Sequence, residues 1–199
     1  MTSSYYTKSA AVLATALLLA TGGCRKYLDQ KPITDVTAEV VFTDVPSTYK
    51  ALAGVYSRLV GDAGYGIRLS LYYPVDNDEM QGPSGAADND RRDIARYSAT
   101  PGNAQITNPF NQLFQGIEFA NICIDNIPKM DKYANGSEEE KKKLQRMYGE
   151  ALTLRAQFYF EAIRNWGDLP SHFISAASQV NSDPFPKRVS LDTLYDRIL

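Results

Sequence analysis

Residues 150–170 read EALTLRAQFYFEAIRNWGDLP, and this stretch decides the fold class. Ala151, Leu154 and Phe158 recur at the three- and four-residue steps of one apolar helix face. Gly167 and Pro170 then stop the helix, because Gly favours a helix C-terminus and Pro cannot continue one. The stretch therefore predicts a long amphipathic helix with a defined exit.

The start of this helix is marked further upstream. Ser137 and Glu140 form the pattern S-x-x-E of a capping box. Residues 138–143 read EEEKKK, which places acids in the first turn and bases one turn later, as the helix dipole favours. We interpret this charge run as a solvated helix face rather than a partner site.

Three further helices are expected. Residues 25–42 read as an extended lead-in, and a first helix then begins at Thr43 or Asp44 and ends at Gly61. Its apolar face is predicted from Val45, Tyr49, Leu52, Ala53, Tyr56, Leu59 and Val60. Asn108 and Pro109 resemble the start of a second helix that ends at Pro128. Its stripe is Phe110, Leu113, Phe114, Ile117, Ala120, Ile124 and Ile127, and Ser190 can cap a last helix.

Residues 61–108 differ from the helices around them. They are rich in Gly and Pro and are punctuated by tyrosines and by Asp/Asn clusters. A connection of this length is usually either functional or disordered, and we interpret this one as an irregular segment that is a candidate for function. The acidic residues from Asp76 to Glu79 do not fit the EF-hand pattern, so we interpret them as a solvated acidic turn, with a looser oxygen-ligand site as the alternative.

The first 23 residues have the pattern of a signal peptide. Lys8 precedes a short apolar run, and Gly22 and Gly23 follow it. Cys24 comes next, and small residues before a Cys at this place resemble the lipobox of bacterial lipoproteins, with Thr21 as a departure. We expect residues 1–23 to be removed and Cys24 to carry lipid, rather than cleavage near Gly22 that leaves a chance Cys.

Composition excludes several classes of function. The 199 residues carry a net charge of -2, which gives no basic face for nucleic acid. One His and two Cys cannot build an ordinary zinc site. His172 has no nucleophile in a recognisable motif, and Cys123 reads as a small buried apolar residue. We therefore expect no enzyme, no catalytic residue, no metal and no cofactor.

The long helix and its exit carry a family resemblance. Leu154-Arg155-Ala156, Tyr159-Phe160 and Trp166-Gly167-Asp168-x-Pro170 resemble the hallmark segment of the SusD/RagB outer-membrane nutrient-binding lipoproteins. The residues after Cys24, the segment 51–56 and the helix from Phe110 resemble the family in the same order. We interpret Arg155 as paired or snorkelling, and Trp166 and Asp168 as fixing the helix exit rather than contacting ligand.

The resemblance implies a mostly α fold of tetratricopeptide-like helix pairs, with a long irregular insertion after the first helix. Family members are several hundred residues long, so residues 24–199 would be the N-terminal part of a SusD-like domain, truncated at its C-terminus. The unfinished apolar pattern at Leu199 agrees with this expectation.

The resemblance also implies a function. The protein would be a lipid-anchored, surface-exposed lipoprotein of the cell outer membrane that binds an oligosaccharide and delivers it to a SusC-like TonB-dependent transporter. In the family, part of the ligand surface comes from the segment that corresponds to residues 62–105. The candidate ligand residues are therefore Tyr72, Tyr73, Asp76, Asn77, Asp78, Arg92 and Tyr97. A RagB-like peptide-binding role and a structural transporter lid without its own ligand are the alternatives.

Overall fold

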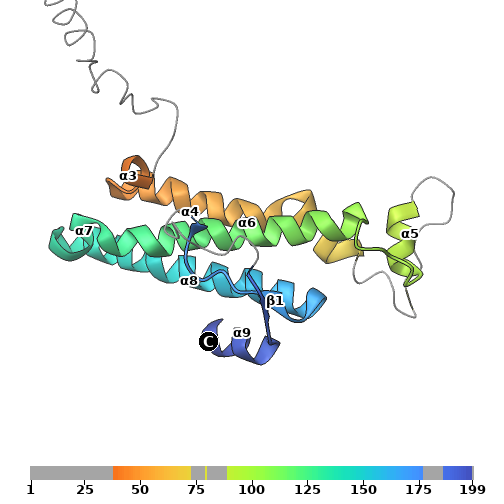
Figure 1. Cartoon of the computed structure of the whole chain (residues 1–199). Helices are drawn as coiled ribbons and strands as arrows, with labels where there is room; N and C mark the ends of the chain where they lie inside the picture. Colours follow the sequence, from red (N-terminus) through yellow and green to blue (C-terminus); the bar gives the residue numbers. More distant parts are fainter. Residues whose placement is uncertain (1–37, 73–78, 80–88, 177–185, 199) are drawn as a thin grey trace, which may run out of the picture. The chain divides into compact units, whose positions relative to one another are not determined.

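Three long helices form the body of the protein. The computed structural model describes residues 38–72, 79, 89–176 and 186–198, all within the unit Thr37–Leu199. The long helices are α4 (Val45–Val60), α6 (Ala104–Asn126) and α8 (Glu138–Trp166), and α6 packs against both others (Figure 1). Helix α6 runs antiparallel to its two neighbours, so consecutive long helices form hairpins.

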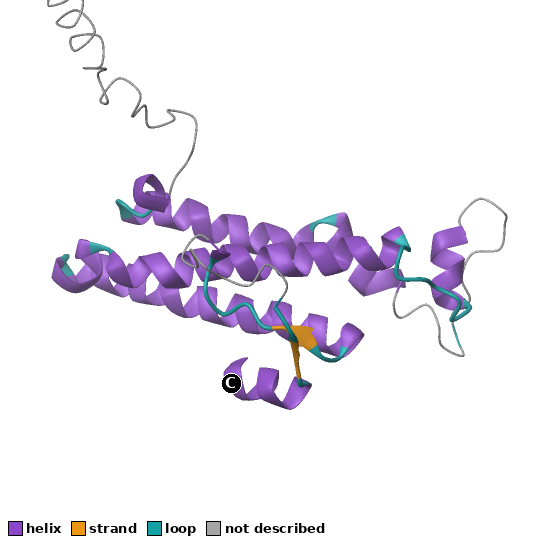
Figure 2. Ribbon diagram, in the orientation of Figure 1, coloured by secondary structure: helices purple, strands orange, loops and turns teal. Residues whose placement is uncertain are grey.

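Short elements precede, connect and follow these helices (Figure 2). They are α3 (Ala38–Val41), η1 (Asp62–Gly66), η2 (Arg68–Tyr72), α5 (Asn89–Ala95), η3 (Ile127–Lys129), α7 (Asp131–Asn135), β1 (Leu169–Pro170), β2 (Arg188–Val189) and α9 (Leu191–Ile198). The two short strands pair antiparallel, Leu169 opposite Val189. The mostly helical fold class is confirmed, and the only sheet of the described ranges is this two-residue pairing.

Helix α8 has the ends that its sequence predicts. The Ser137 hydroxyl accepts the backbone N–H of Glu140, and the Glu140 carboxylate accepts the backbone N–H of Ser137, so the capping box is complete. Glu138 pairs with Lys141 and Glu139 with Lys143 on the solvated face. Gly167 ends the helix with φ 68°, a conformation that favours glycine.

The core lies where α6 and α8 cross. Leu113, Ile117 and Ala120 of α6 face Leu154 and Phe158 of α8, and all five side chains are buried. Gly116 allows the two helices to approach closely, because a Cβ at this position would lie 2.5 Å from the Phe158 Cζ. The predicted stripe of α6 is confirmed, and its partly buried members pack against the same core.

The predicted apolar face of α4 is confirmed in part, because Leu52 is buried and Val45 and Leu59 pack against the core, but its other members face solvent. The buried side chains are Thr48, Leu52 and Val55, whereas Tyr49 is 57% exposed and Tyr56 44% exposed. Ala53 and Val60 are exposed as well. Thr48 can face the core because its hydroxyl donates to the Asp44 carbonyl at 2.8 Å, so burial leaves no polar group without a partner.

Two helix starts also differ from the prediction. Helix α6 begins at Ala104, five residues before Pro109, because the Asn103 side chain accepts the backbone N–H of Gln105 and caps the helix. Pro109 therefore lies inside the helix. Residues 38–41 of the expected extended lead-in form helix α3, while the rest of that lead-in, before residue 38, lies outside the described residues.

The insertion after α4 breaks the regular helix pairs, and its described parts are short helices. Side chains near the start of this insertion attach it to the body. The Tyr65 hydroxyl donates to Glu161 of α8 at 2.5 Å, and Arg68 Nε donates to Gln105 of α6 at 2.9 Å. Burial, together with the carboxylate of Glu161, raises the pKa of Tyr65 to about 12. The insertion is thus fixed to the ends of α6 and α8 that lie next to the pocket described below.

Candidate functional site

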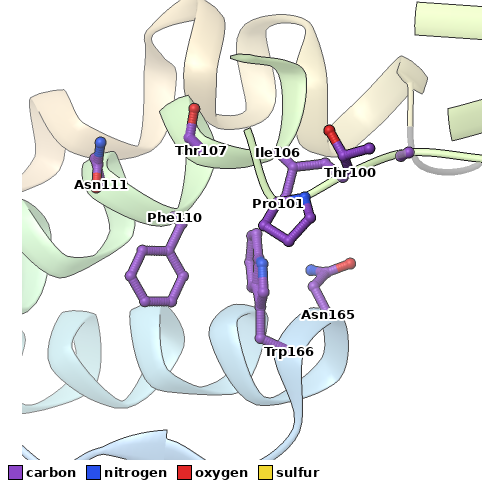
Figure 3. A pocket seen from close by; sticks show the side chains of 9 residues that line it. Thr100, Pro101, Ile106, Thr107, Phe110, Asn111, Asn165 and Trp166 are labelled. Carbon is purple, nitrogen blue, oxygen red and sulfur yellow. The ribbon is translucent and has the colours of Figure 1, made fainter. Parts of the chain in front are cut away.

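An open pocket lies where the start of α6, the end of α8 and the loop before α6 meet (Figure 3). Its volume is about 530 Å³, within the range typical of small-molecule sites. The lining residues are Ala99, Thr100, Pro101, Ile106, Thr107, Phe110, Asn111, Asn165 and Trp166. In Figure 3 the Trp166 ring stands between Phe110 and Asn165, with Pro101 at its outer end.

The aromatic side of the pocket is continuous with the core. Phe110 meets Trp166 edge to face with 5.4 Å between ring centroids, and Phe110 packs on Phe114 at 4.5 Å. Phe114 in turn meets the His172 ring edge to face at 6.0 Å. These contacts hold the indole in place from the interior while it still lines the pocket.

Three polar side chains of α6 and α8 line the pocket. Among the described residues, the Asn111 amide and the Thr107 hydroxyl make no hydrogen bond. Asn165 Nδ2 donates to the Glu161 carbonyl at 2.8 Å, which fixes the amide plane and leaves Oδ1 to accept from elsewhere. Thr107 and Asn111 lie one turn apart on α6, so their side chains share one face.

The exit of α8 holds Trp166 at the pocket. The backbone N–H of Gly167 donates to the Ile163 carbonyl at 2.9 Å and closes the helix directly after the indole. Asp168 then reaches the next element: its Oδ1 accepts the backbone N–H of Leu191 at 3.1 Å, and its carbonyl accepts Arg188 Nε at 2.8 Å. Asp168 therefore caps α9, a scaffold role like the one expected for it.

A buried polar network lies on the same two helices. Arg155 Nη1 donates to Asn121 Oδ1 at 3.0 Å and to the Phe173 carbonyl at 3.1 Å, and its guanidinium lies over the Phe173 ring at 5.0 Å. Burial lowers the pKa of Arg155, which still far exceeds neutral pH. Arg155 is paired, as expected.

This network holds the loop after α8. Asn121 Nδ2 donates to the His172 carbonyl at 2.7 Å, and the Tyr159 hydroxyl bonds both the N–H and the carbonyl of His172, at 2.7 and 3.0 Å. Asp125 accepts the backbone N–H of Ser175 at 2.9 Å. The hallmark residues Arg155 and Tyr159 therefore position a loop, and their polar groups are occupied.

The predicted ligand residues are only partly described. Arg92 lies half-buried on α5, and Tyr97 follows α5 with φ 55° and a side chain that is 84% exposed. Tyr97 is two residues before Ala99, so its Cα lies within about 7 Å of the Cα of this pocket residue. Tyr72 ends η2, but its side chain lies outside the described residues. Outside them too are Cys24, Tyr73, Asp76, Asn77 and Asp78.

The sequence interpretation missed the pocket residues on α6 and α8. Trp166 lines the pocket in addition to packing at the helix exit. Thr107, Asn111 and Asn165 belong to no motif. Single polar residues on a helix usually face solvent, so the sequence did not mark these three as site residues. The available signal was position: Asn165 precedes Trp166 at a helix end, and Asn111 lies one residue after Phe110 in a stripe of aromatic residues.

A second hollow, of about 340 Å³, lies between α4 and α8 and contains Tyr49 and Tyr56. Its polar groups bond one another: the Tyr56 hydroxyl donates to Glu150 at 3.0 Å, and Arg146 pairs with Glu150 at 2.6 Å. The Trp166 pocket, where the Thr107 hydroxyl and the Asn111 amide make no hydrogen bond among the described residues, is therefore the better candidate for a ligand.

The thiol, the acidic residues and the helices of the described ranges point to no other kind of site. Cys123 is buried, and burial raises the pKa of its thiol to about 12, so the prediction of a small buried apolar residue is confirmed. No three His, Cys, Asp or Glu side chains of the described parts gather as a metal-ligand set. No described helix combines the length and apolar character needed to cross a membrane.

Comparisons with known proteins agree with one another. A family model described as "Starch-binding associating with outer membrane" matches residues 26–199. Two SusD-like proteins of Formosa agariphila are each 24% identical, over 77% and 88% of this chain but 29% and 32% of their own length. The chain thus spans about a third of the length of these relatives.

Two solved structures also resemble this chain. The crystal structure of a SusD homolog from Bacteroides thetaiotaomicron matches with a TM-score of 0.72 and 25% identity, covering 83% of this chain and 30% of that one. A SusD superfamily structure from the same organism matches with a TM-score of 0.60 at 20% identity, over 78% and 35% of the two chains, and supports the fold alone. Because the family model spans residues 26–199, the chain belongs to the SusD/RagB family, as its hallmark segment had predicted.

Proposed function

We propose that the protein is a nutrient-binding lipoprotein of the cell outer membrane that binds a glycan without turning it over and passes it to a SusC-like TonB-dependent transporter. The observation that carries this proposal is the family match over residues 26–199, whose description names starch binding and association with the outer membrane. The named relatives from Formosa agariphila support it as SusD-like proteins.

The proposed ligand surface lies at the end of the molecule where the insertion joins α6 and α8. Tyr97 and Arg92 lie on this insertion, and the open pocket beside Trp166 is adjacent to it in sequence. An exposed aromatic side chain with amide and hydroxyl groups nearby suits the apolar faces and the hydroxyl groups of sugars. Tyr72, Tyr73, Asp76, Asn77 and Asp78 remain candidates in the same segment.

We also propose a membrane attachment through Cys24. Residues 1–23 would act as a signal peptide, and residues 24–199 would form the N-terminal part of a longer SusD-like domain. Lipid on Cys24 would keep the protein at the membrane, because more than one acyl chain gives stable anchoring. In cells, Cys24→Ala should move the protein from the membrane fraction to the soluble fraction, and unchanged fractionation would reject the anchor.

The function is tested by titrating the complete protein, prepared without lipid, against panels of glycans and of peptides. We expect saturable binding to a glycan and no release of reducing sugar. Saturable binding to peptides alone would move the function to peptide uptake. Co-purification with a transporter and no binding to either panel would identify a structural lid.

A further inference from the structure

We infer that the pocket beside Trp166 is a subsite for one ring of a neutral saccharide, with the indole as its stacking surface. This inference rests on the proposed function, because it names the place and chemistry of glycan contact. None of the residues that line the pocket is among the candidate ligand residues that the family resemblance implied, so the assignment comes from the geometry of this chain.

The charge of the pocket defines the class of ligand. None of the nine lining residues is ionisable. A charged ligand would lose its hydration without gaining an opposite charge, which is costly. The site also lacks the carboxylates that a bound cation would need. A neutral ligand with many hydroxyl groups satisfies both conditions.

The lining combines two surfaces that a sugar ring needs. Trp166, Phe110 and Pro101 form an apolar wall on which the C–H face of a pyranose can pack, and Trp supplies the largest such surface of any residue. Thr107, Asn111 and Asn165 supply both hydrogen-bond donors and acceptors at its edge. Hydroxyl groups at the edge of the same ring can bond these groups while the face is stacked.

The site is formed before any ligand arrives. Asn103 caps α6 and also donates to the Asp90 carbonyl at 2.7 Å, which ties the lining loop between α5 and α6 to α5. Gly167 and Phe110 hold the indole, and the Glu161 carbonyl holds the Asn165 amide. A ligand therefore orders few side chains on binding, which favours affinity.

The experiment measures binding of four neutral hexasaccharides, maltohexaose, cellohexaose, xylohexaose and mannohexaose, to the complete protein by calorimetry. We expect at least one to bind and Trp166→Ala to raise its Kd by about tenfold or more, as for a central aromatic contact. Phe160→Ala is the matched control: it removes a 39% exposed aromatic from the same helix, outside the pocket, and should leave Kd within about twofold.

Two conservative variants test the subsite while the indole stays in place, so they separate weaker binding from misfolding. Thr107→Val and Asn111→Ala remove groups that make no hydrogen bond among the described residues, and each should raise Kd about two- to tenfold without changing the thermal melt. Trp166 is the only Trp of the 199 residues, so the emission difference between the wild-type protein and Trp166→Phe reports on the pocket. A bound hexasaccharide should protect this component from acrylamide quenching.

The following outcomes would contradict the proposed subsite. A hexasaccharide that binds equally well to Trp166→Ala, Thr107→Val and Asn111→Ala, with no protection of Trp166, overturns the subsite and leaves the glycan-binding function intact. Binding of none of the four, when other glycans of the panel bind, also overturns it. If no glycan binds at all, both proposals fail. Binding of end-capped neutral peptides at Trp166 instead would overturn the saccharide assignment.

Discussion

The network around Arg155 and the pocket beside Trp166 lie on the same two helices, and they differ in whether their polar groups are occupied. In the network, Arg155, Asn121 and Tyr159 bond one another or the backbone of the loop that follows α8. In the pocket, the Thr107 hydroxyl and the Asn111 side-chain amide make no hydrogen bond among the described residues. Occupied polar groups indicate scaffold, whereas unoccupied groups on a formed wall indicate a place for ligand.

This difference divides the hallmark segment itself. Arg155 and Tyr159 hold a loop, Asp168 caps α9, and Gly167 ends α8. Only Trp166 both packs against the core and lines the pocket. A motif that identifies the family therefore consists mostly of residues that build the fold, and it names few of the residues that could contact ligand.

The largest effect on stability is expected at the network. Arg155→Ala removes a charged donor from Asn121 Oδ1 and from the Phe173 carbonyl and should lower the free energy of unfolding by about 3 kcal/mol, since hydrogen bonds to charged groups each contribute roughly 1.5–3 kcal/mol. Chemical denaturation measures the change. Asn111→Ala, on the pocket side, should change stability by less than about 0.5 kcal/mol.

Equal losses of stability in Arg155→Ala and Asn111→Ala would contradict this distinction between the network and the pocket. An Arg155→Ala loss below about 1 kcal/mol would mean that water replaces the guanidinium and that the network is not the scaffold. Arg155→Lys should lie between the wild-type protein and Arg155→Ala, because Lys keeps the charge but cannot form the same fork of donors.

The next largest effect tests how closely α6 and α8 pack between the two regions. Gly116→Ala places a Cβ against the fully buried Phe158 ring and should cost about 1–3 kcal/mol. Gly149→Ala is the matched control, because nothing lies within 4 Å of its Cβ, and it should stabilise α8 by up to about 1 kcal/mol. Thermal melts separate the two, and stabilisation by both would show that the helices can move apart.

Much of this fold follows from local sequence. The capping box at Ser137, the stop at Gly167 and the stripe of α6 were predicted, because caps and helical periodicity act within a few residues. The errors came from tertiary context. The apolar bodies of Tyr49 and Tyr56 suggested a core face, but the side of α4 that meets α6 and α8 is set by packing, and Thr48 meets it with an internal hydrogen bond.

The candidate site was less accessible to sequence analysis. The family resemblance pointed to the insertion, where Tyr97 is exposed two residues before Ala99 of the pocket wall. Asn165 of α8 lies more than 50 positions after Thr107 and Asn111 of α6, and only the antiparallel packing of the two helices brings these residues together. The start of α6 was misplaced for a related reason: Asn103 is stabilised as a cap by its bond to Asp90 of α5, outside the helix.

A smaller effect, with a pH signature, is expected at Tyr159. Tyr159→Phe leaves the His172 N–H without its acceptor and should cost about 1–2 kcal/mol at pH 7. Burial raises the pKa of Tyr159 to about 12 from 10, so the folded protein holds the phenol proton more tightly than the unfolded chain. This stabilisation is complete below pH 10 and is lost as the pH rises towards 12.

Denaturation at pH 8 and pH 11 tests this difference. The wild-type protein should lose more stability between the two pH values than Tyr159→Phe, which has no proton to release at this position. Equal losses would assign the alkaline decline to other buried groups, such as Tyr65 and Cys123, whose pKa values are also raised to about 12.

The smallest effect on stability, and the sharpest separation of scaffold from site, is expected at Tyr97. Its φ of 55° is a conformation that Asn adopts more readily than Tyr, so Tyr97→Asn should leave stability unchanged or raise it by up to about 1 kcal/mol. The exposed ring lies next to the pocket wall, so we expect the same variant to weaken hexasaccharide binding about two- to fivefold. Calorimetry and thermal melts on one preparation measure both quantities.

A matched variant, Tyr49→Asn, removes an exposed tyrosine from α4, away from the pocket, and should leave Kd unchanged. Stability and affinity that move in opposite directions only at Tyr97 would mean that a strained backbone is retained there for binding. If Tyr97→Asn lowered stability as well as affinity, the ring would belong to the scaffold, and the boundary between the two regions would lie closer to Trp166.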